Sequence, residues 1–348
     1  MHDGKGQTLT PQFNFILQPE FPMNGLILAI DALRIANQNS GRSIFKWTLV
    51  SESGEAIRAS NGMWMGADCA LKDMPEAQVY LLFEGNLPIQ HNSARMMAAL
   101  RAAARFGAIV GAVDTGAFAL AQAGLAGTEK NPNVALHWEA VPAFTERYPG
   151  ANPVNQIYLF ENQRAHCAGG VATLDLMLDL VAHYEGEPLA NEISNALVHT
   201  RRDSTIEQRN DGLLKTESHP LSGRIIRLME DNLDFPLTLE QLARQLRIPQ
   251  RTLSYACKKV LGESPMRLYL RLRLQAARNF LFYEEYSIKD VSTACGFSYP
   301  SVFARVFRAQ FGQTPHEFRA GIRAKQRQNV RPEILRMLSR EMSAKAGN

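Results

Sequence analysis

The chain has 348 residues, of which 45% are hydrophobic and 21% are charged, and its formal net charge is +4. This length allows two domains, each of which can bury a core of its own. The longest apolar stretches, such as 108–113, are far shorter than a membrane span, and residues 1–6 lack a signal-peptide pattern. We therefore expect a cytoplasmic protein with no membrane partner.

The cysteines predict neither disulfides nor a metal site. Cys69, Cys167, Cys257 and Cys295 form no C-x-x-C pair and no cluster with histidine at metal spacing. His166 precedes Cys167, but adjacent residues of a strand point to opposite faces, so this pair is not expected to form a catalytic dyad. No metal and no cofactor are predicted.

Strands and helices are predicted to alternate through the first half of the chain. The strands are expected at 13–17, 45–51, 79–83, 108–113, 156–160 and 165–167, and helical patterns lie near 24–38, 92–105, 116–123, 136–147 and 170–185. This alternation predicts an α/β domain over 10–187, a mostly parallel sheet sandwiched by helices in a flavodoxin-like arrangement. Ligands bind at the carboxyl ends of the strands in such folds. The candidate site therefore lies in the loops that follow Leu17, Phe83, Val113 and Cys167.

A strand that runs into a tight turn and then a helix is predicted at 111–118, with the sequence GAVDTGAF. This segment resembles the nucleophile elbow of the class I glutamine amidotransferase-like superfamily, which includes PfpI-type proteases and glyoxalase-like proteins. Those enzymes have a cysteine where Asp114 stands, and a carboxylate is a much poorer acyl-transfer nucleophile, so no catalytic residue is expected. Asp114 has two interpretations of equal weight. It either contacts a ligand or caps the next helix by accepting from the amide of Gly116 or Ala117.

Carboxylates follow neighbouring predicted strands at Glu20, Glu84 and Asp114, where they would repel one another unless a cation or protons relieve them. An aromatic face from Phe21, Trp64 or Trp138 would favour a cation further. The alternatives are that the aromatics fill a core, that Glu20 and Glu84 are solvated, and that His137 only packs. A ligand carboxylate would meet Thr115 or nearby amides at the helix N-terminus. The predicted ligand-binding residues are Glu20, Glu84, Asp114, Thr115, His137 and Trp138.

A connection over 188–219 joins this domain to the second half of the chain. Residues 189–200 are predicted to be helical, and the polar, weakly patterned stretch from Arg201 to Pro220 is predicted to be a hinge or linker. Past Gly321 no pattern that can pack is found. A polar tail over 324–348, partly disordered, is expected to add non-specific DNA affinity.

Residues 238–323 contain a short amphipathic helix, a tight turn and a second helix twice, with repeat positions 49 to 50 residues apart. Each copy closes with glycine and then proline, which suit a left-handed helix end and forbid its continuation. An all-α tandem helix-turn-helix domain is therefore predicted over 220–323. Residues 219–348 hold 22 Lys+Arg against 11 Asp+Glu, whereas 1–218 hold 16 against 23. This asymmetry indicates a module that binds nucleic acid, attached to a domain with another task.

The last third of the chain resembles the DNA-binding domain of the AraC/XylS family of transcription regulators. The resemblance rests on ARNFL at 277–281, CGFS at 295–298 and FARVFRAQFGQTP at 303–315. The first unit departs from the family, because Arg247 replaces the usual turn glycine. Spacing on the first recognition helix and the family positions of the second predict contacts to double-stranded DNA, with Arg251 and Arg305 as the main guanine readers. The predicted contacts are Arg251, Ser254, Tyr255, Lys258, Pro300, Ser301, Ala304, Arg305 and Arg308.

Segments at 124–127, 137–139 and 167–178 extend the resemblance to regulators that fuse an amidotransferase-like domain to an AraC-type reader. Membership of that group implies a sensor of a small nitrogenous metabolite, such as glycine betaine, carnitine, sarcosine or arginine. It also implies activation of catabolic genes, with RNA polymerase as the target. We expect a homodimer formed by the first domain. The alternatives are a PfpI-like amidase or glyoxalase that carries a DNA-binding tail, and a constitutive DNA-binding protein whose first domain only dimerises.

Overall fold

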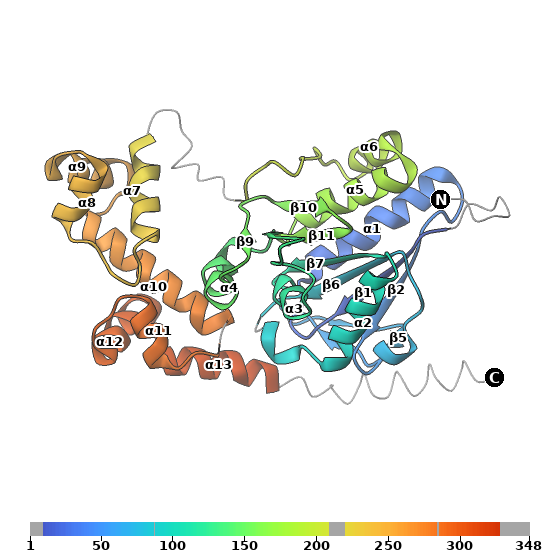
Figure 1. Ribbon diagram of the computed structural model, residues 1–348, viewed down its shortest axis with the longest axis horizontal. Coiled ribbons are helices and arrows are strands. Elements are labelled where there is room, and N and C mark those ends of the chain that lie inside the picture. The colour runs from blue at the N-terminus through green and yellow to red at the C-terminus, as the bar shows by residue number, and fades with distance from the viewer. Residues whose placement is uncertain (1–9, 87, 209–219, 284, 328–348) are drawn as a thin grey trace.

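The computed structural model describes residues 10–86, 88–208, 220–283 and 285–327 (Figure 1). An α/β domain is followed by an all-α domain, which confirms the predicted fold class. The predictions for 1–6, for the linker residues 209–219 and for the tail from 328 onward lie outside the described residues.

A seven-stranded sheet forms the centre of the first domain, in the order β10-β11-β7-β6-β1-β2-β5. Its strands are β1 (Gln12–Leu17), β2 (Lys46–Ser51), β5 (Cys69–Ala70), β6 (Val79–Glu84), β7 (Ile109–Asp114), β10 (Tyr158–Glu161) and β11 (Arg164–Cys167). All neighbouring pairs are parallel except β10 with β11. The six predicted strands are present with ends shifted by at most two residues.

Two short strand pairs and β5 were not predicted, because two-residue strands carry no periodicity. The pairs are β3 (Ile57–Arg58) with β4 (Trp64–Met65), and β8 (Asn133–Val134) with β9 (Asn152–Pro153). The helix expected at 136–147 is divided into a 3-10 turn, η3 (Trp138–Ala140), and α4 (Val141–Arg147). Two further 3-10 turns are η1 (Leu71–Asp73) and η2 (Pro88–His91).

Helices cover both faces of the sheet. Side chains alternate between the two faces along each strand. Phe13 and Phe15 of β1 therefore share one core with α1 (Met23–Ser40), α5 (Ala172–Glu185) and α6 (Glu187–Ala196). Ile16 shares the opposite core with α2 (Ala94–Arg105), α3 (Ala117–Gln122) and α4. Phe21 is fully buried in the first of these cores, which favours the alternative that this aromatic side chain fills a core.

The chain after α6 stays on the first domain as far as Gln208. Asp175 is fully buried, and its carboxylate accepts from the backbone N of Arg202 at 2.9 Å and from Nη2 of Arg202 at 2.6 Å. The same carboxylate lies 2.7 Å from Nε2 of His199. The hinge predicted from Arg201 onward is therefore wrong for 201–208, because polar residues without periodicity can still be held by a buried carboxylate.

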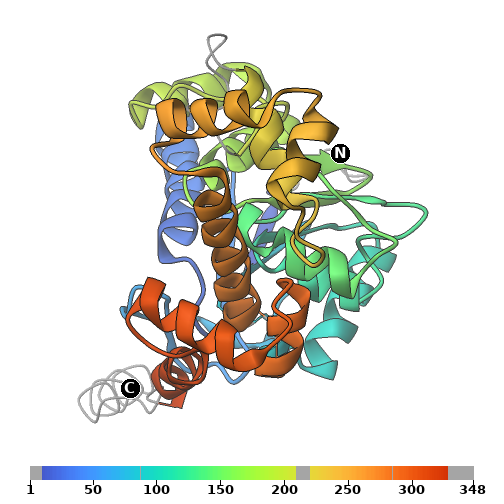
Figure 2. The ribbon, with the colours of Figure 1, turned by 90° about the vertical axis from the view of Figure 1, so that its left-hand side faces the viewer.

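The second domain consists of helices around a central one. They are α7 (Pro220–Glu230), α8 (Leu239–Leu246), α9 (Gln250–Leu261), α10 (Pro265–Tyr283), α11 (Ile288–Ala294), α12 (Pro300–Phe311) and α13 (Pro315–Arg327). Figure 2 shows α10 along the middle, with α8 and α9 near one end and α11 and α12 near the other. α13 continues past Gly321 to Arg327, so 324–327 are helical and do not belong to the partly disordered tail predicted from 324. Arg, Ala, Lys and Gln at 323–327 are good helix formers, so the helix needs no apolar stripe to continue.

Candidate functional site

The loops that follow β1, β6 and β7 meet at the carboxyl edge of the sheet, as predicted from the order of the strands. Glu84 and Asp114 are register partners at the ends of β6 and β7. The loop after β1 comes so close that a Cβ added to Gly85 would lie 2.1 Å from the carbonyl oxygen of Glu20. The hydroxyl of Thr115 donates to the carbonyl oxygen of Gly85, which joins the β6 and β7 loops.

Glu84 is fully buried, and among the described residues neither of its carboxylate oxygens has a hydrogen-bond partner. Burial raises its pKa well above the usual range, and the charge of Asp114 raises it further. A buried carboxylate without a partner is costly, because it has lost its hydration without compensation. Such a group fits a site that receives a donor or a cation from outside the chain.

Asp114 occupies a left-handed backbone conformation, with φ of 64°, at the turn between β7 and α3. Helix α3 begins after Gly116 and has no side-chain cap, so the interpretation of Asp114 as an N-cap is wrong. Burial raises the pKa of Asp114 to about 7, with a further contribution from the charge of Glu139. A carboxyl that titrates near neutral pH beside Glu84 can accept a cation or hold a proton.

His137 and Trp138 lie on the loop that leads into η3. The amide of His137 donates to the carbonyl oxygen of Asp114 at 3.4 Å, and Nδ1 of His137 accepts from the amide of Glu139 at 3.4 Å. Gln208 holds this loop, because its side chain accepts from the amide of Trp138 at 2.9 Å and donates to the carbonyl oxygen of Leu136 at 2.8 Å. The loop is thereby fixed beside Asp114.

The remaining predicted ligand residue, Glu20, is 7% exposed and accepts from Nδ2 of Asn86 at 3.4 Å, so it is not a solvated loop carboxylate. Trp64 lies on β4 opposite Arg58 of β3, and the carbonyl oxygen of Arg58 accepts from the amide of Glu20 at 2.9 Å, so the strand that carries Trp64 adjoins the loop after β1. The structure adds Glu139 to the group, since its charge acts on both Asp114 and His137. Glu139 belongs to the segment 137–139 that carries part of the family resemblance, but nothing in the sequence marked its side chain as part of the site.

His166 and Cys167 do not form a reactive pair. Both are fully buried, and neither ring nitrogen of His166 finds a hydrogen-bond partner in the part of the chain that the structure describes. Burial lowers the pKa of His166 to about 4 and raises the pKa of Cys167 to about 12, so both are neutral near pH 7. Within the described residues, no group of three or more His, Cys, Asp or Glu side chains can hold a metal ion. No helix in that part of the chain is both long and apolar enough to cross a bilayer.

The predicted DNA contacts lie on the recognition helices α9 and α12. Two of them, Ser254 and Ala304, are partly buried, and the other seven are exposed. The exposed contacts are Arg251, Tyr255, Lys258, Pro300, Ser301, Arg305 and Arg308. The opposite faces of α9 and α12 hold Leu253, Cys257, Phe303 and Phe307, which are fully buried. Each helix therefore presents a polar and basic face outward.

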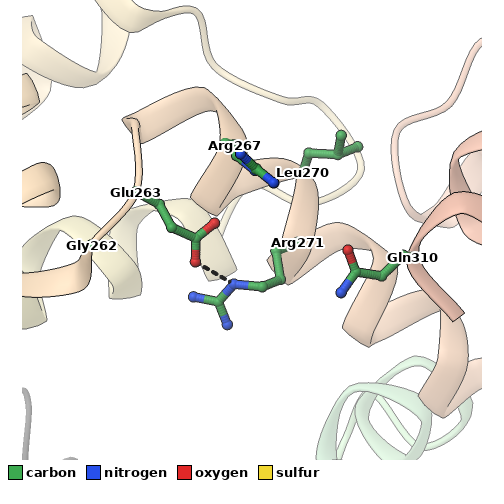
Figure 3. A pocket seen from close by; sticks show the side chains of 6 residues that line it. All are labelled: Gly262, Glu263, Arg267, Leu270, Arg271 and Gln310. Atoms are coloured by element: carbon green, nitrogen blue, oxygen red, sulfur yellow. Dashed lines mark hydrogen bonds and ion pairs between the residues drawn. The ribbon is translucent and has the colours of Figure 1, made fainter.

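A cavity of about 450 Å³ lies within the second domain, between the ends of α9 and α12 and the first half of α10 (Figure 3). It is lined by Gly262, Glu263, Arg267, Leu270, Arg271 and Gln310. Nε of Arg271 donates to Glu263 across it at 2.8 Å. None of the residues predicted to bind ligand or DNA lines this cavity.

Comparison with known proteins assigns the family. Residues 242–321 match the model of a helix-turn-helix domain. The chain is 34% identical over 318 residues to the HTH-type transcriptional regulator CdhR of Pseudomonas aeruginosa, covering 90% of this chain and 92% of that protein. This chain belongs to the family of HTH-type transcriptional regulators. The alternative interpretation as an enzyme has no support among these relatives.

Two further similarities extend over different parts of the regulator. The regulator ArgR of P. aeruginosa is 32% identical over 321 residues, covering 90% of this chain and 94% of its own length. The crystal structure of an AraC family regulator from Pseudomonas putida is 23% identical, covers 54% of this chain and 99% of its own, and has a TM-score of 0.48. The AraC-type DNA-binding domain predicted from 277–315 is confirmed.

Proposed function

We propose that this regulator binds a small amine metabolite at the carboxyl edge of the first domain and acts in the cytoplasm as an activator of catabolic genes. The observation that carries this proposal is Glu84, a fully buried carboxylate with no hydrogen-bond partner that is paired in register with Asp114. A primary or quaternary amine bound there would supply a positive charge, which stabilises the ionised form of these two carboxyl groups. The carboxylate of a betaine or an amino acid would be placed at Thr115, whose amide and hydroxyl donate to the carbonyl oxygens of Glu84 and Gly85 in the structure.

Isothermal titration of the full-length protein with glycine betaine, carnitine, sarcosine and L-arginine tests the site. We expect one of these compounds to bind, and we expect Asp114→Ala to weaken its affinity by at least about tenfold, which is about 1.4 kcal/mol. The matched control is Asp31→Ala, because Asp31 is an acidic residue of the same domain whose carboxylate pairs with Arg34 on α1. Equal affinity in wild type and Asp114→Ala, or binding of only anionic or apolar compounds, would disprove the proposed site.

The second domain is proposed to read DNA through α9 and α12. Arg251 and Arg305 can each make a bidentate contact to guanine, worth about 1–3 kcal/mol of base discrimination. Ser254, Tyr255, Pro300, Ser301 and Ala304 would complete the surfaces in the grooves, and Lys258 and Arg308 would bind phosphates. Since α10 connects the two units, we expect half-sites about one DNA turn apart, roughly 10 bp, on one face of the duplex.

Gel-shift titration against a duplex selected from random sequence by the full-length protein tests these assignments. Arg251→Ala and Arg305→Ala should each weaken binding and relax the preference at one base pair. Arg244→Ala is the control, because Arg244 is 71% exposed on α8 and lies outside the recognition helices. Unchanged affinity and preference in Arg305→Ala, or a footprint confined to one major groove, would contradict the model of two readers. A homodimer formed through the first domain and contact with RNA polymerase complete the proposal.

A further inference from the structure

The C-terminal half of α10, a helix of the DNA-binding domain, lies against the loop that carries His137 and Glu139. α10 contacts both η3 and α4 of the first domain (Figure 1). Ala277, Leu281 and Tyr283 of α10 are buried in the same hydrophobic cluster as Leu136 and Ala140. The second domain therefore covers one side of the carboxylate group described above.

An ion pair crosses this contact between the domains. Nη2 of Arg278 donates to Oε1 of Glu139 at 2.7 Å, and the two side chains are 32% and 22% exposed. Tyr283, 7% exposed, lies nearby. Burial raises the pKa of the Tyr283 phenol, and the charges of Asp114 and Glu139 raise it further, so this side chain is close to both carboxylates.

The acidic residues form a continuous series from the sheet to α10. The charge of Asp114 acts on Glu84, and the charge of Glu139 acts on Asp114. Glu139 is the member of the series that is paired with a cationic residue of the second domain. A cation that binds Oε1 of Glu139 competes with Arg278, because Arg278 donates to that same oxygen.

We propose that the effector site is shared between the domains, and that the cationic group of the effector takes the place of Arg278 on Glu139, which releases α10 from the first domain. This inference rests on the proposed effector class and adds its specificity residue and its mode of regulation. Release of α10 alters the positions of both recognition helices relative to the first domain, because α10 packs against α9 as well as against α11 and α12. The effector and the docked helix then exclude each other, so each weakens the binding of the other.

Titration of full-length Arg278→Gln with L-arginine and glycine betaine tests this exchange. Because a competitor is removed, we expect the affinity for the bound amine to rise about fivefold. The matched control is Arg271→Gln, since Arg271 lies on the same helix and pairs with Glu263 of its own domain. Arg278→Lys keeps the charge and should retain an affinity close to that of wild type. Hydrogen exchange of the amides at 276–283 should become faster in Arg278→Gln and stay unchanged in Arg271→Gln.

The outcomes separate the two proposals. Binding of an amine to wild type with equal or lower affinity in Arg278→Gln overturns the exchange alone, and lower affinity would mean that Arg278 holds the effector. If neither compound binds to wild type or to Arg278→Gln, both the effector class and the proposed replacement of Arg278 are overturned. Slower or unchanged hydrogen exchange of the amides at 276–283 in a normally folded Arg278→Gln variant would also overturn the proposed replacement of Arg278 by the effector. In gel-shift titrations without effector, Arg278→Gln should move toward the operator affinity of effector-loaded wild type.

Discussion

The two helix-turn-helix units have the same architecture but are held differently at their turns. In the first unit, Arg247 adopts the left-handed conformation, with φ of 57°, and its side chain is exposed. In the second unit, Gly296 adopts this conformation, with φ of 72°, and an added Cβ would lie 2.5 Å from the carbonyl oxygen of Leu233. Arg273 also donates to the carbonyl oxygens of Cys295 and Gly296, at 2.8 and 2.7 Å. The first turn tolerates a side chain, whereas the second is enclosed.

The core of the second unit is also more closely connected to the rest of the molecule than the core of the first unit. Leu242, Leu253 and Tyr269 of the first unit and α10 form a separate cluster with α7. Phe303 and Phe307 of the second unit belong to a cluster that continues through α10 into the first domain. A change at the sheet edge therefore reaches the second unit within one cluster of packed side chains, whereas it reaches the first unit through α10 and through Leu233, which packs against both clusters. The second unit is the one placed to respond to the first domain.

The largest expected difference between the two units is in how their stability changes with pH as Asp114 titrates. Burial raises the pKa of Asp114 to about 7 in the folded chain, well above the usual value for an aspartate, so the native state holds the proton more tightly than the unfolded chain. Stability attributable to this group is present at low pH and is lost between about pH 4 and pH 7, by up to about 4 kcal/mol. The groups that face it are Glu84 on β6, His137 and Glu139 beside η3, Cys167 on β11 and Tyr283 on α10.

Thermal unfolding of wild type and Asp114→Asn at pH 5 and pH 8 measures this effect. Asp114→Asn should reduce the loss of stability between the two values. After correction for the intrinsic effect of pH on amide exchange, the exchange rates in α12 should increase with pH more than the exchange rates in α9. An equal response of both helices would contradict the difference in coupling.

Substitution of the two turn residues should have unequal effects on stability. Gly296→Ala places a Cβ against backbone and Pro236 in a strained conformation, so we expect a loss of about 2–3 kcal/mol. Arg247→Gly removes a strained side-chain position and should stabilise the first unit by less than about 1 kcal/mol. Chemical denaturation measures both. Losses of similar size in Gly296→Ala and Arg247→Ala would remove the distinction between the turns.

The smallest predicted effect on stability comes from the helix caps, and it should be equal in the two units. Thr238 caps α8 with Gln241, and Ser287 caps α11 with Asp290, each as a reciprocal capping box. Thr238→Ala and Ser287→Ala should each lower the free energy of unfolding by about 1 kcal/mol. Since the caps are alike, any larger effect of Ser287→Ala on operator affinity would report the coupling of the second unit to the first domain.

The sequence predicted the fold because long, regular patterns repeat in it. The alternation of strands and helices and the two copies of the helix-turn-helix unit each extend over many residues, so local exceptions did not alter them. The convergence of Glu84 and Asp114 also followed from sequence, since parallel strands bring their ends together. Arg278 and Glu139 are 139 residues apart, and no local pattern marks either as a partner of the other. Likewise the Asp175 cluster that holds Arg202 depends on tertiary packing alone.

Gln208 has a consequence for how far the DNA-binding domain can travel. Its side chain fixes the chain beside Trp138, and the next described residue is Pro220, the first of α7. The covalent chain between these points can span at most about 40 Å. A tether this short keeps α10 at an effective concentration in the millimolar range around its docking surface. Release of α10 is therefore a local rearrangement whose equilibrium does not depend on protein concentration, and redocking needs no encounter between separate molecules.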